Sequence, residues 1–124
     1  MLSWPPTVKI YLGADPTDMR KGFDSLAHLV ESSMSLDPLS GHLFVFRSRQ
    51  CDRIKILYWD ADGYVLWYKR LEKGCFRFPA ATTEGATKGV EVKAADLIMI
   101  LDGVDLGSVR RQRRYSRETV ENPR

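Results

Sequence analysis

The chain has 124 residues, of which 44% are hydrophobic and 28% charged, and its formal net charge is +3. This size and composition indicate one globular domain that can bury a core without disulfides or metals. No apolar run reaches the roughly 18 residues that a membrane span needs. The first residues also lack the pattern of a secretory signal, so we expect a cytoplasmic protein.

The positive charge is concentrated at the C-terminal end. Residues 107–124 hold six arginines against two glutamates, which is +4, so the preceding 106 residues sum to −1. Dense arginines of this kind contact phosphate backbones. We therefore expect an α+β domain at residues 1–106 and a disordered tail at residues 107–124. The tail arginines expected to bind nucleic acid are Arg110, Arg111, Arg113 and Arg114.

The first third of the chain predicts a strand followed by a long helix. Residues 7–12 alternate between apolar and polar side chains, as a half-buried strand does. Asp15 and Pro16, or Thr17, can begin a helix whose apolar side chains recur every three or four residues to about Ser33. Arg20 and Lys21 would lie in its first turn, where the helix dipole does not favour cations. They either reach a carboxylate such as Asp24 or point at an external anion.

The rest of the chain predicts a β-meander and a second helix. Strands are expected at residues 42–47, 53–60 and 64–71, with Asp62-Gly63 as the turn of a hairpin. Residues 76–78 could add a short strand, and residues 80–89 have the composition of a mobile loop. Residues 94–103 predict a helix with Gly103 just past its end. The predicted fold is α+β, with a mostly antiparallel sheet of four to five strands, one long helix after the first strand and a short C-terminal helix.

Alternation along the three central strands predicts one core face and one basic face. The core face would hold Phe44, Phe46, Ile54, Ile56 and Leu66; the other would hold Arg47, Lys55, Lys69, Leu57, Trp59 and Trp67. Cations beside tryptophans on a sheet are typical of nucleic-acid binding, because cations neutralise phosphates and rings stack on bases. The alternative is that lysine and arginine stems only cover apolar strands, which is common. The pattern leaves both open.

Signals for catalysis are weak. Asp60 and Asp62 resemble a metal-binding pair, but a hairpin turn explains them more simply. Cys51 lies between Arg49 and Arg53, which would lower the pKa of its thiol, yet no general base accompanies it. The two cysteines and two histidines also lack the spacing of a metal site. We expect two free thiols and no enzyme activity, cofactor or metal.

A series of motifs in order along the chain resembles a known family. The segments WPP, VKIYL, TDMRKGFDSLAHLV, DPLSGHLFVFRSR, DRIKILYWDADGYVLWYKRLEKGCFRFP and DLIMILDGVDL span about residues 4–106. They resemble the accessory protein TnpB of bacterial insertion sequences of family sixty-six, which is unrelated to the RNA-guided nuclease of that label. The resemblance implies a helper encoded beside a transposase, without catalytic activity of its own. This chain departs from the pattern at Gln50-Cys51 and at Cys75, which weakens the positive face.

Three hypotheses follow. In the first, a DNA-binding accessory factor of a mobile genetic element holds the ends of that element. Its binding residues would be Arg47, Arg49, Arg53, Lys55 and Lys69, together with the tail arginines. In the second, the protein docks on the transposase without contacting DNA. Its contact residues would be Asp18, Arg20 and Lys21, with Trp59 or Trp67. In the third, Asp60 and Asp62 serve a metal-dependent nuclease.

Overall fold

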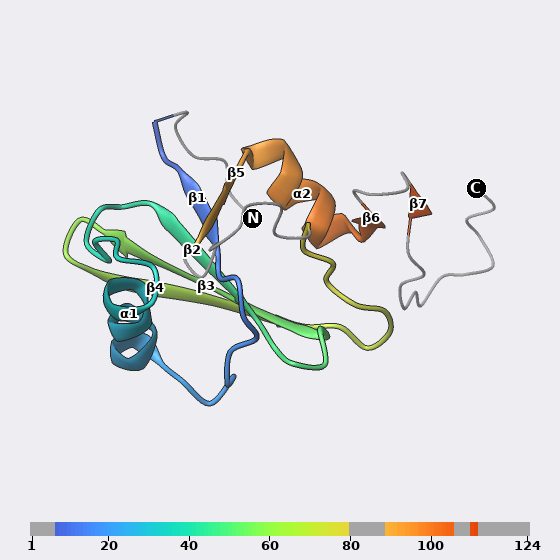
Figure 1. Ribbon diagram of the computed structural model, residues 1–124, viewed down its shortest axis with the longest axis horizontal. Helices are drawn as coiled ribbons and strands as arrows, with labels where there is room; N and C mark the ends of the chain where they lie inside the picture. The colour runs from blue at the N-terminus through green and yellow to red at the C-terminus, as the bar shows by residue number, and fades with distance from the viewer. Residues whose placement is uncertain (1–6, 80–88, 106–109, 112–124) are drawn as a thin grey trace.

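The computed structural model describes residues 7–79, 89–105 and 110–111 (Figure 1). Its centre is a five-stranded sheet with the strand order β4-β3-β2-β1-β5. The strands are β1 (Ile10–Leu12), β2 (Leu43–Arg47), β3 (Arg53–Asp60), β4 (Gly63–Arg70) and β5 (Val90–Val92). β1 and β2 are parallel, and the other neighbouring pairs are antiparallel. The α+β class is thus confirmed, with a mixed sheet.

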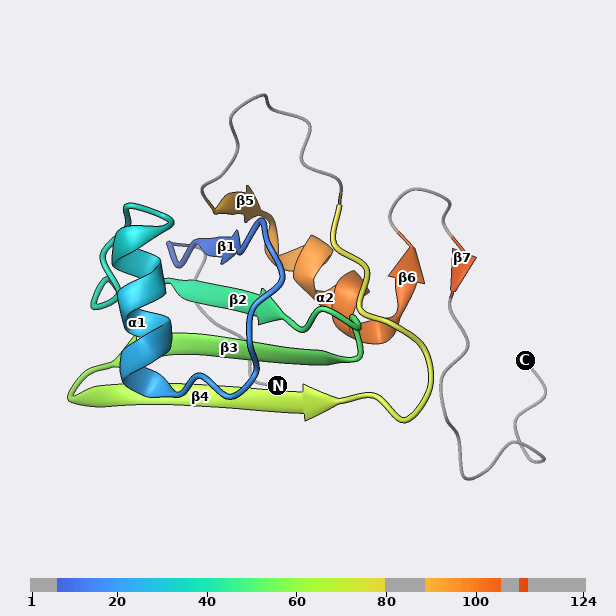
Figure 2. The same ribbon diagram turned by 60° about the horizontal axis from the view of Figure 1, so that its bottom comes forward.

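Two helices cover opposite faces of this sheet. α1 (Phe23–Ser32) lies across one face, and α2 (Ala94–Asp102) lies on the other (Figures 1 and 2). α1 belongs to the crossover that joins the parallel strands β1 and β2, a connection that a tight turn cannot make. Each helix covers its own core. The α2 side buries Ile10, Leu12, Leu43, Val45, Ile54, Ile56, Leu71, Phe76, Leu97 and Ile100. The α1 side buries Leu26, Ala27, Val30, Met34, Phe44, Phe46 and Leu57.

The register between β2 and β3 decides which side chains share a face. Phe44 pairs with Leu57, and Phe46 pairs with Lys55. Because directly paired residues of an antiparallel ladder point to the same side, Phe44 and Phe46 face α1 together with Lys55 and Leu57. The prediction that they share a face with Ile54 and Ile56 is wrong. Alternation within each strand was correct, but the phase between strands was off by one residue.

α1 is shorter than predicted because the chain before it is held in another conformation. The Gly13 amide donates to the Val45 carbonyl and the Thr17 amide to the Arg47 carbonyl, both at 2.8 Å. These bonds keep residues 13–17 beside β2 after β1 has ended. The segment then crosses the sheet towards β4 before α1 begins at Phe23 (Figure 2). The predicted end near Ser33 is confirmed, since Ser33 caps the helix.

Local signals elsewhere were accurate in part. β3 and β4 form the expected hairpin, but Asp60 pairs with Gly63, so the two-residue turn is Ala61-Asp62 rather than the predicted Asp62-Gly63. Ala61 adopts a left-handed conformation there, with φ 54°. α2 ends at Asp102, and Gly103 has φ 86°. Within the described residues, 76–78 form no strand, while β5 was not predicted. The expected loop at residues 80–89 lies outside the described residues except for Gly89.

A second, small pair of strands lies beyond α2. β6 (Val104–Asp105) and β7 (Arg110–Arg111) pair antiparallel. Apart from β7, the predicted tail lies outside the described residues. Neither helix in the described part of the chain is long and apolar enough to cross a membrane.

Candidate nucleic-acid interface

A hollow of about 670 Å³ opens on the α1 face of the sheet, where β2 turns into β3. It is lined by residues 16–20 before α1, by residues 48–50 after β2, by Arg53 at the start of β3 and by Tyr68 of β4. Its charged lining residues are Arg20, Arg49, Arg53 and the carboxylate Asp18. We call this feature the arginine hollow.

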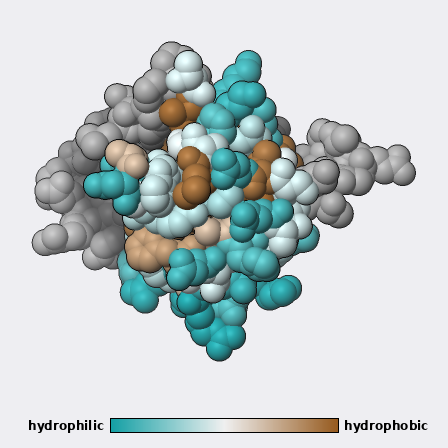
Figure 3. Space-filling model, turned by 90° about the vertical axis from the view of Figure 1, so that its left-hand side faces the viewer, coloured by the Kyte–Doolittle hydropathy of each residue, from teal (hydrophilic) through white to brown (hydrophobic). Residues whose placement is uncertain are grey.

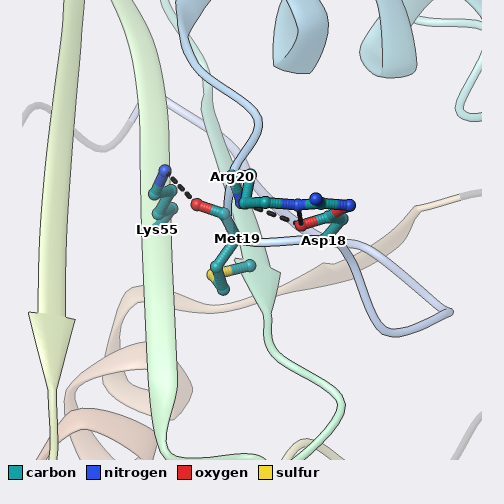
Figure 4. Close-up of polar contacts among 4 residues, drawn as sticks. All are labelled: Asp18, Met19, Arg20 and Lys55. Carbon is teal, nitrogen blue, oxygen red and sulfur yellow. Dashed lines mark hydrogen bonds and ion pairs between the residues drawn. The ribbon is translucent and has the colours of Figure 1, made fainter.

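Lys55 fixes one wall of the hollow. This β3 lysine is 7% exposed, and its Nζ donates to the carbonyl oxygens of Met19 and Lys21, both at 2.7 Å (Figure 4 draws the Met19 bond). The ammonium also lies 4.6 Å from the centre of the Tyr68 ring. A buried charge is tolerated only when such partners replace water. Lys55 was predicted to bind nucleic acid; the structure instead uses its ammonium to hold residues 19–21 against the sheet.

Asp18 and Arg20 form a paired unit on the same wall. The Arg20 Nη2 donates to Asp18 Oδ2 at 2.7 Å, and Nε lies 3.1 Å from both carboxylate oxygens (Figure 4). The Arg20 amide also donates to Asp18 Oδ1 at 2.9 Å, which closes a tight turn. Of the two roles considered for Arg20, the structure shows a carboxylate partner, and it is Asp18 rather than Asp24.

The Asp18 carboxyl should titrate well below its ordinary range. The side-chain bond from Arg20, followed by the bond from the Arg20 amide, lowers the pKa of Asp18 from 3.8 to about 2. The charged pair therefore persists above pH 3.8 and is lost as the pH falls through about 2. Carbon-detected NMR titration should place the Asp18 midpoint near 2 in the native protein.

Replacing Arg20 with glutamine should move this midpoint back towards 3.8. Arg49→Gln serves as the matched control, because no bond joins Arg49 to Asp18, and it should leave the titration unchanged. A midpoint near 3.8 in the unaltered protein would show that the pair does not form in solution.

The loop between β2 and β3 is organised by Ser48, which is 3% exposed. The Ser48 amide donates to the Arg53 carbonyl at 2.9 Å, and the Arg53 amide donates to Ser48 Oγ at 3.1 Å. Ser48 Oγ in turn donates to Asp52 Oδ1 at 3.1 Å. These bonds close the turn and leave Arg49 and Gln50 exposed at its tip.

Arg53 is also exposed, with a side chain that is 44% accessible and 4.0 Å from Asp52. In the hairpin it lies directly opposite Arg70, which pairs with Glu72 at 3.1 Å. Like charges opposite one another destabilise a sheet. Each of the two arginines has an acidic partner, Asp52 for Arg53 and Glu72 for Arg70, which offsets part of this repulsion.

Arg47 lies on the other face of the sheet, and its surroundings are different. Its guanidinium lies 5.0 Å from the centre of the Phe78 ring, and Nη1 donates to Cys51 Sγ at 3.2 Å. Both cysteines are free of disulfide bonds, as predicted. Burial and a hydrogen bond with Cys51 raise the pKa of the Cys75 thiol to about 11. The cation beside the Cys51 thiol is therefore Arg47, and not Arg49 or Arg53, which the sequence had suggested.

The remaining predicted residues do not form one surface. Lys69 pairs with Ile54 and Trp67 with Ile56, so both point to the α2 side. Trp59 points to the α1 side, edge-on to Tyr64 with ring centres 5.0 Å apart. The prediction of a single basic face that includes both tryptophans is wrong. Arg110 and Arg111 lie in β7, and Arg113 and Arg114 lie outside the described residues.

The hollow gathers residues that the sequence patterns had separated. Arg49 and Arg53 were predicted to bind nucleic acid, whereas Asp18 and Arg20 were assigned to a protein contact. Tyr68 and Ser48 were not singled out at all, and Gln50 was named only as a departure from the family pattern. The clue to Tyr68 is its direct pairing with Lys55, which only the register reveals.

Asp60 and Asp62, the metal ligands of the third hypothesis, belong to the hairpin between β3 and β4. β3 ends at Asp60 and β4 begins at Gly63, so Asp62 lies in the two-residue connection. Within the described residues, no group of three or more histidine, cysteine or acidic side chains could hold a metal ion.

Comparison with known proteins identifies the family. The sequence profile described as IS66 Orf2 like protein matches residues 8–111. The chain belongs to this family. As an IS66 Orf2-like protein, it is an accessory protein associated with insertion sequences, and the resemblance seen in its motifs is confirmed. The matched range includes every residue that lines the arginine hollow.

Two curated relatives come from Sinorhizobium fredii strain NBRC 101917 / NGR234. The chain is 39% identical to "Uncharacterized protein y4hO" over 105 residues, which is 85% of this chain and 88% of that protein. It is 35% identical to "Uncharacterized protein y4jC" over 105 residues, which is 85% of this chain and 86% of that protein. No solved structure matches the chain.

Proposed function

We propose that this protein is a non-catalytic accessory factor of transposition that binds DNA through the arginine hollow. The observation that supports the proposal most directly is the convergence of Arg20, Arg49 and Arg53 around one concave site. Arginine is suited to this role because its planar guanidinium can hold two phosphate oxygens at once.

The charge of the site contrasts with the charge of the chain around it. Residues 1–106 sum to −1, yet the charged residues lining the hollow are three arginines and one aspartate. Asp18 is already occupied by Arg20, so its carboxylate repels a phosphate less than a free one would. Local clustering of cations, rather than net charge, governs binding to a polyanion. The tail arginines Arg110, Arg111, Arg113 and Arg114 would add affinity that does not depend on sequence.

The test compares the affinity of the unaltered protein and of the double variant Arg49→Ala/Arg53→Ala for duplex DNA. Fluorescence anisotropy measures the affinity at several salt concentrations. Each phosphate contact contributes a slope of about −0.9 to the plot of log affinity against log salt. We therefore expect weaker binding and a slope shallower by about 2. Lys69→Ala is the matched control, because Lys69 is exposed on the opposite face. Identical affinity and slope in all three proteins would remove the hollow from DNA binding.

The second candidate function is docking on the transposase. It is favoured by the Asp18–Arg20 pair, in which the Arg20 side chain is 91% exposed, and by the nearby Phe23, which is 48% exposed. On the side that carries α1, however, exposed apolar side chains form small patches separated by hydrophilic ones (Figure 3). Capture of purified transposase that survives nuclease treatment would favour docking. Capture that nuclease abolishes would favour DNA.

A further inference from the structure

We propose that the arginine hollow takes an unpaired nucleotide, with the base stacked on Tyr68 and the phosphate held by Arg49 and Arg53. This inference rests on the proposed DNA binding and specifies which form of DNA the hollow recognises. It assigns a ligand-contacting role to Tyr68, a residue to which the sequence patterns gave no function.

Tyr68 is a ring fixed in place yet accessible. It is 50% exposed, although its cross-strand partner Lys55 is buried. The Lys55 ammonium lies 4.6 Å from the ring centre and is itself held by two backbone carbonyls. The ring therefore has a fixed support on one side and lines the hollow with its accessible part. A ring held in this way loses little freedom when a base stacks on it.

The shape of the site favours a single nucleotide over an intact duplex. Bases inside a duplex are covered on both faces by their neighbours, so only an unpaired base can stack on a protein ring. The hollow, at about 670 Å³, falls within the range of small-ligand pockets, about 300–1,000 Å³.

The polar groups of the hollow match the rest of a nucleotide. Arg49 lies in the turn after β2 and Arg53 begins β3, and Ser48 bonds to both Asp52 and Arg53 across this turn, so the two arginines line the hollow from one hydrogen-bonded connection. Gln50 is exposed at the tip of that turn and also lines the hollow. Its amide can both donate to and accept from a base edge. Aromatic, cationic and amide groups thus surround one cavity.

The test compares three labelled DNA probes: a blunt duplex, the same duplex with a short unpaired overhang, and that overhang with abasic sugars in place of bases. We expect the overhang to bind about tenfold more tightly than the blunt duplex, as stacking of one base provides. The abasic overhang should lose this gain. Because that arm uses the unaltered protein, it does not depend on the folding of any variant.

Variants at Tyr68 test whether its ring provides the tighter binding of the overhang. Tyr68→Leu should abolish the preference for the overhang and leave blunt-duplex affinity within about twofold, whereas Tyr68→Phe should keep it, because stacking uses the ring. Tyr58→Leu, on the opposite face, is the matched control and should keep the preference.

The outcomes separate this inference from the proposed function. Equal binding of overhang and blunt duplex, or an equal loss of both in Tyr68→Leu, would overturn the inference while DNA binding stands. A gain that persists with the abasic overhang would also overturn it, because the phosphates alone would then suffice. Absence of binding to every probe would overturn both.

Discussion

Replacing Lys55 with methionine should lower the free energy of unfolding by about 3 kcal/mol, measured by urea denaturation. Methionine keeps most of the length and volume of lysine but removes both bonds to residues 19 and 21. Hydrogen bonds to a charged group contribute about 1.5–3 kcal/mol each. The two carbonyls would also lose a partner in a site where the lysine is only 7% exposed. Relief from burying a charge offsets part of this loss.

The control is Lys69→Met, because Lys69 is an exposed lysine on the neighbouring strand with its side chain on the opposite face. It should change stability by less than about 0.5 kcal/mol. Amide hydrogen exchange gives a local readout: residues 17–22 should exchange faster in Lys55→Met and not in Lys69→Met. Equal effects of the two substitutions would mean that the Lys55 ammonium does not hold this segment.

The same lysine shows why the site could not be read from the sequence. Within its strand Lys55 alternates correctly with Ile54 and Ile56, and that pattern suggested an exposed cation. Its partner Met19 is 36 residues away and accepts through a backbone carbonyl, a group that every residue carries. The residue types at positions 19 and 21 therefore could not predict this contact.

Elements defined by local chemistry were predicted well. The hairpin between β3 and β4, whose turn is Ala61-Asp62 and so lies one residue before the predicted one, and the end of α2 at Gly103 depend on turn and cap residues that act over a few positions. The start of α1 was missed because Asp15 and Pro16 satisfy the rules for a helix start, but backbone bonds from Gly13 and Thr17 to β2 hold the chain in a non-helical path. Tertiary contacts outweighed local preference there.

Strand register was the largest gap between prediction and structure. The turn between β2 and β3 includes Cys51 in a left-handed conformation, with φ 64°. The turn brings Arg47 opposite Ile54, so even-numbered residues of β2 pair with odd-numbered residues of β3, whereas the prediction had placed even-numbered residues of both strands on one face. A one-residue shift moves every side chain of a strand to the other face relative to its neighbour. Lys55 and Leu57 consequently joined the α1 core instead of an exposed basic surface.

Leu57→Ala is therefore expected to be as damaging as Ile56→Ala, although the two neighbours point to opposite faces. Both are 0% exposed, Ile56 in the core under α2 and Leu57 in the core under α1. Removing a buried leucine or isoleucine side chain down to alanine costs about 2–5 kcal/mol, through lost burial and the cavity left behind. Urea denaturation of the two variants should give losses of this size for each.

Asp60→Ala is the matched control for Leu57→Ala, since it truncates an exposed side chain of the same strand and should cost less than about 0.5 kcal/mol. A sheet with one buried face would behave differently, with a large loss for Ile56→Ala and a loss below about 1 kcal/mol for Leu57→Ala. That result would show that Leu57 faces solvent and would again support the predicted exposed basic face. Comparable losses would instead show that Leu57 and Ile56 are both buried, on opposite faces of the sheet. The proposed DNA binding would then be left to the exposed arginines Arg49 and Arg53 at the end of the sheet.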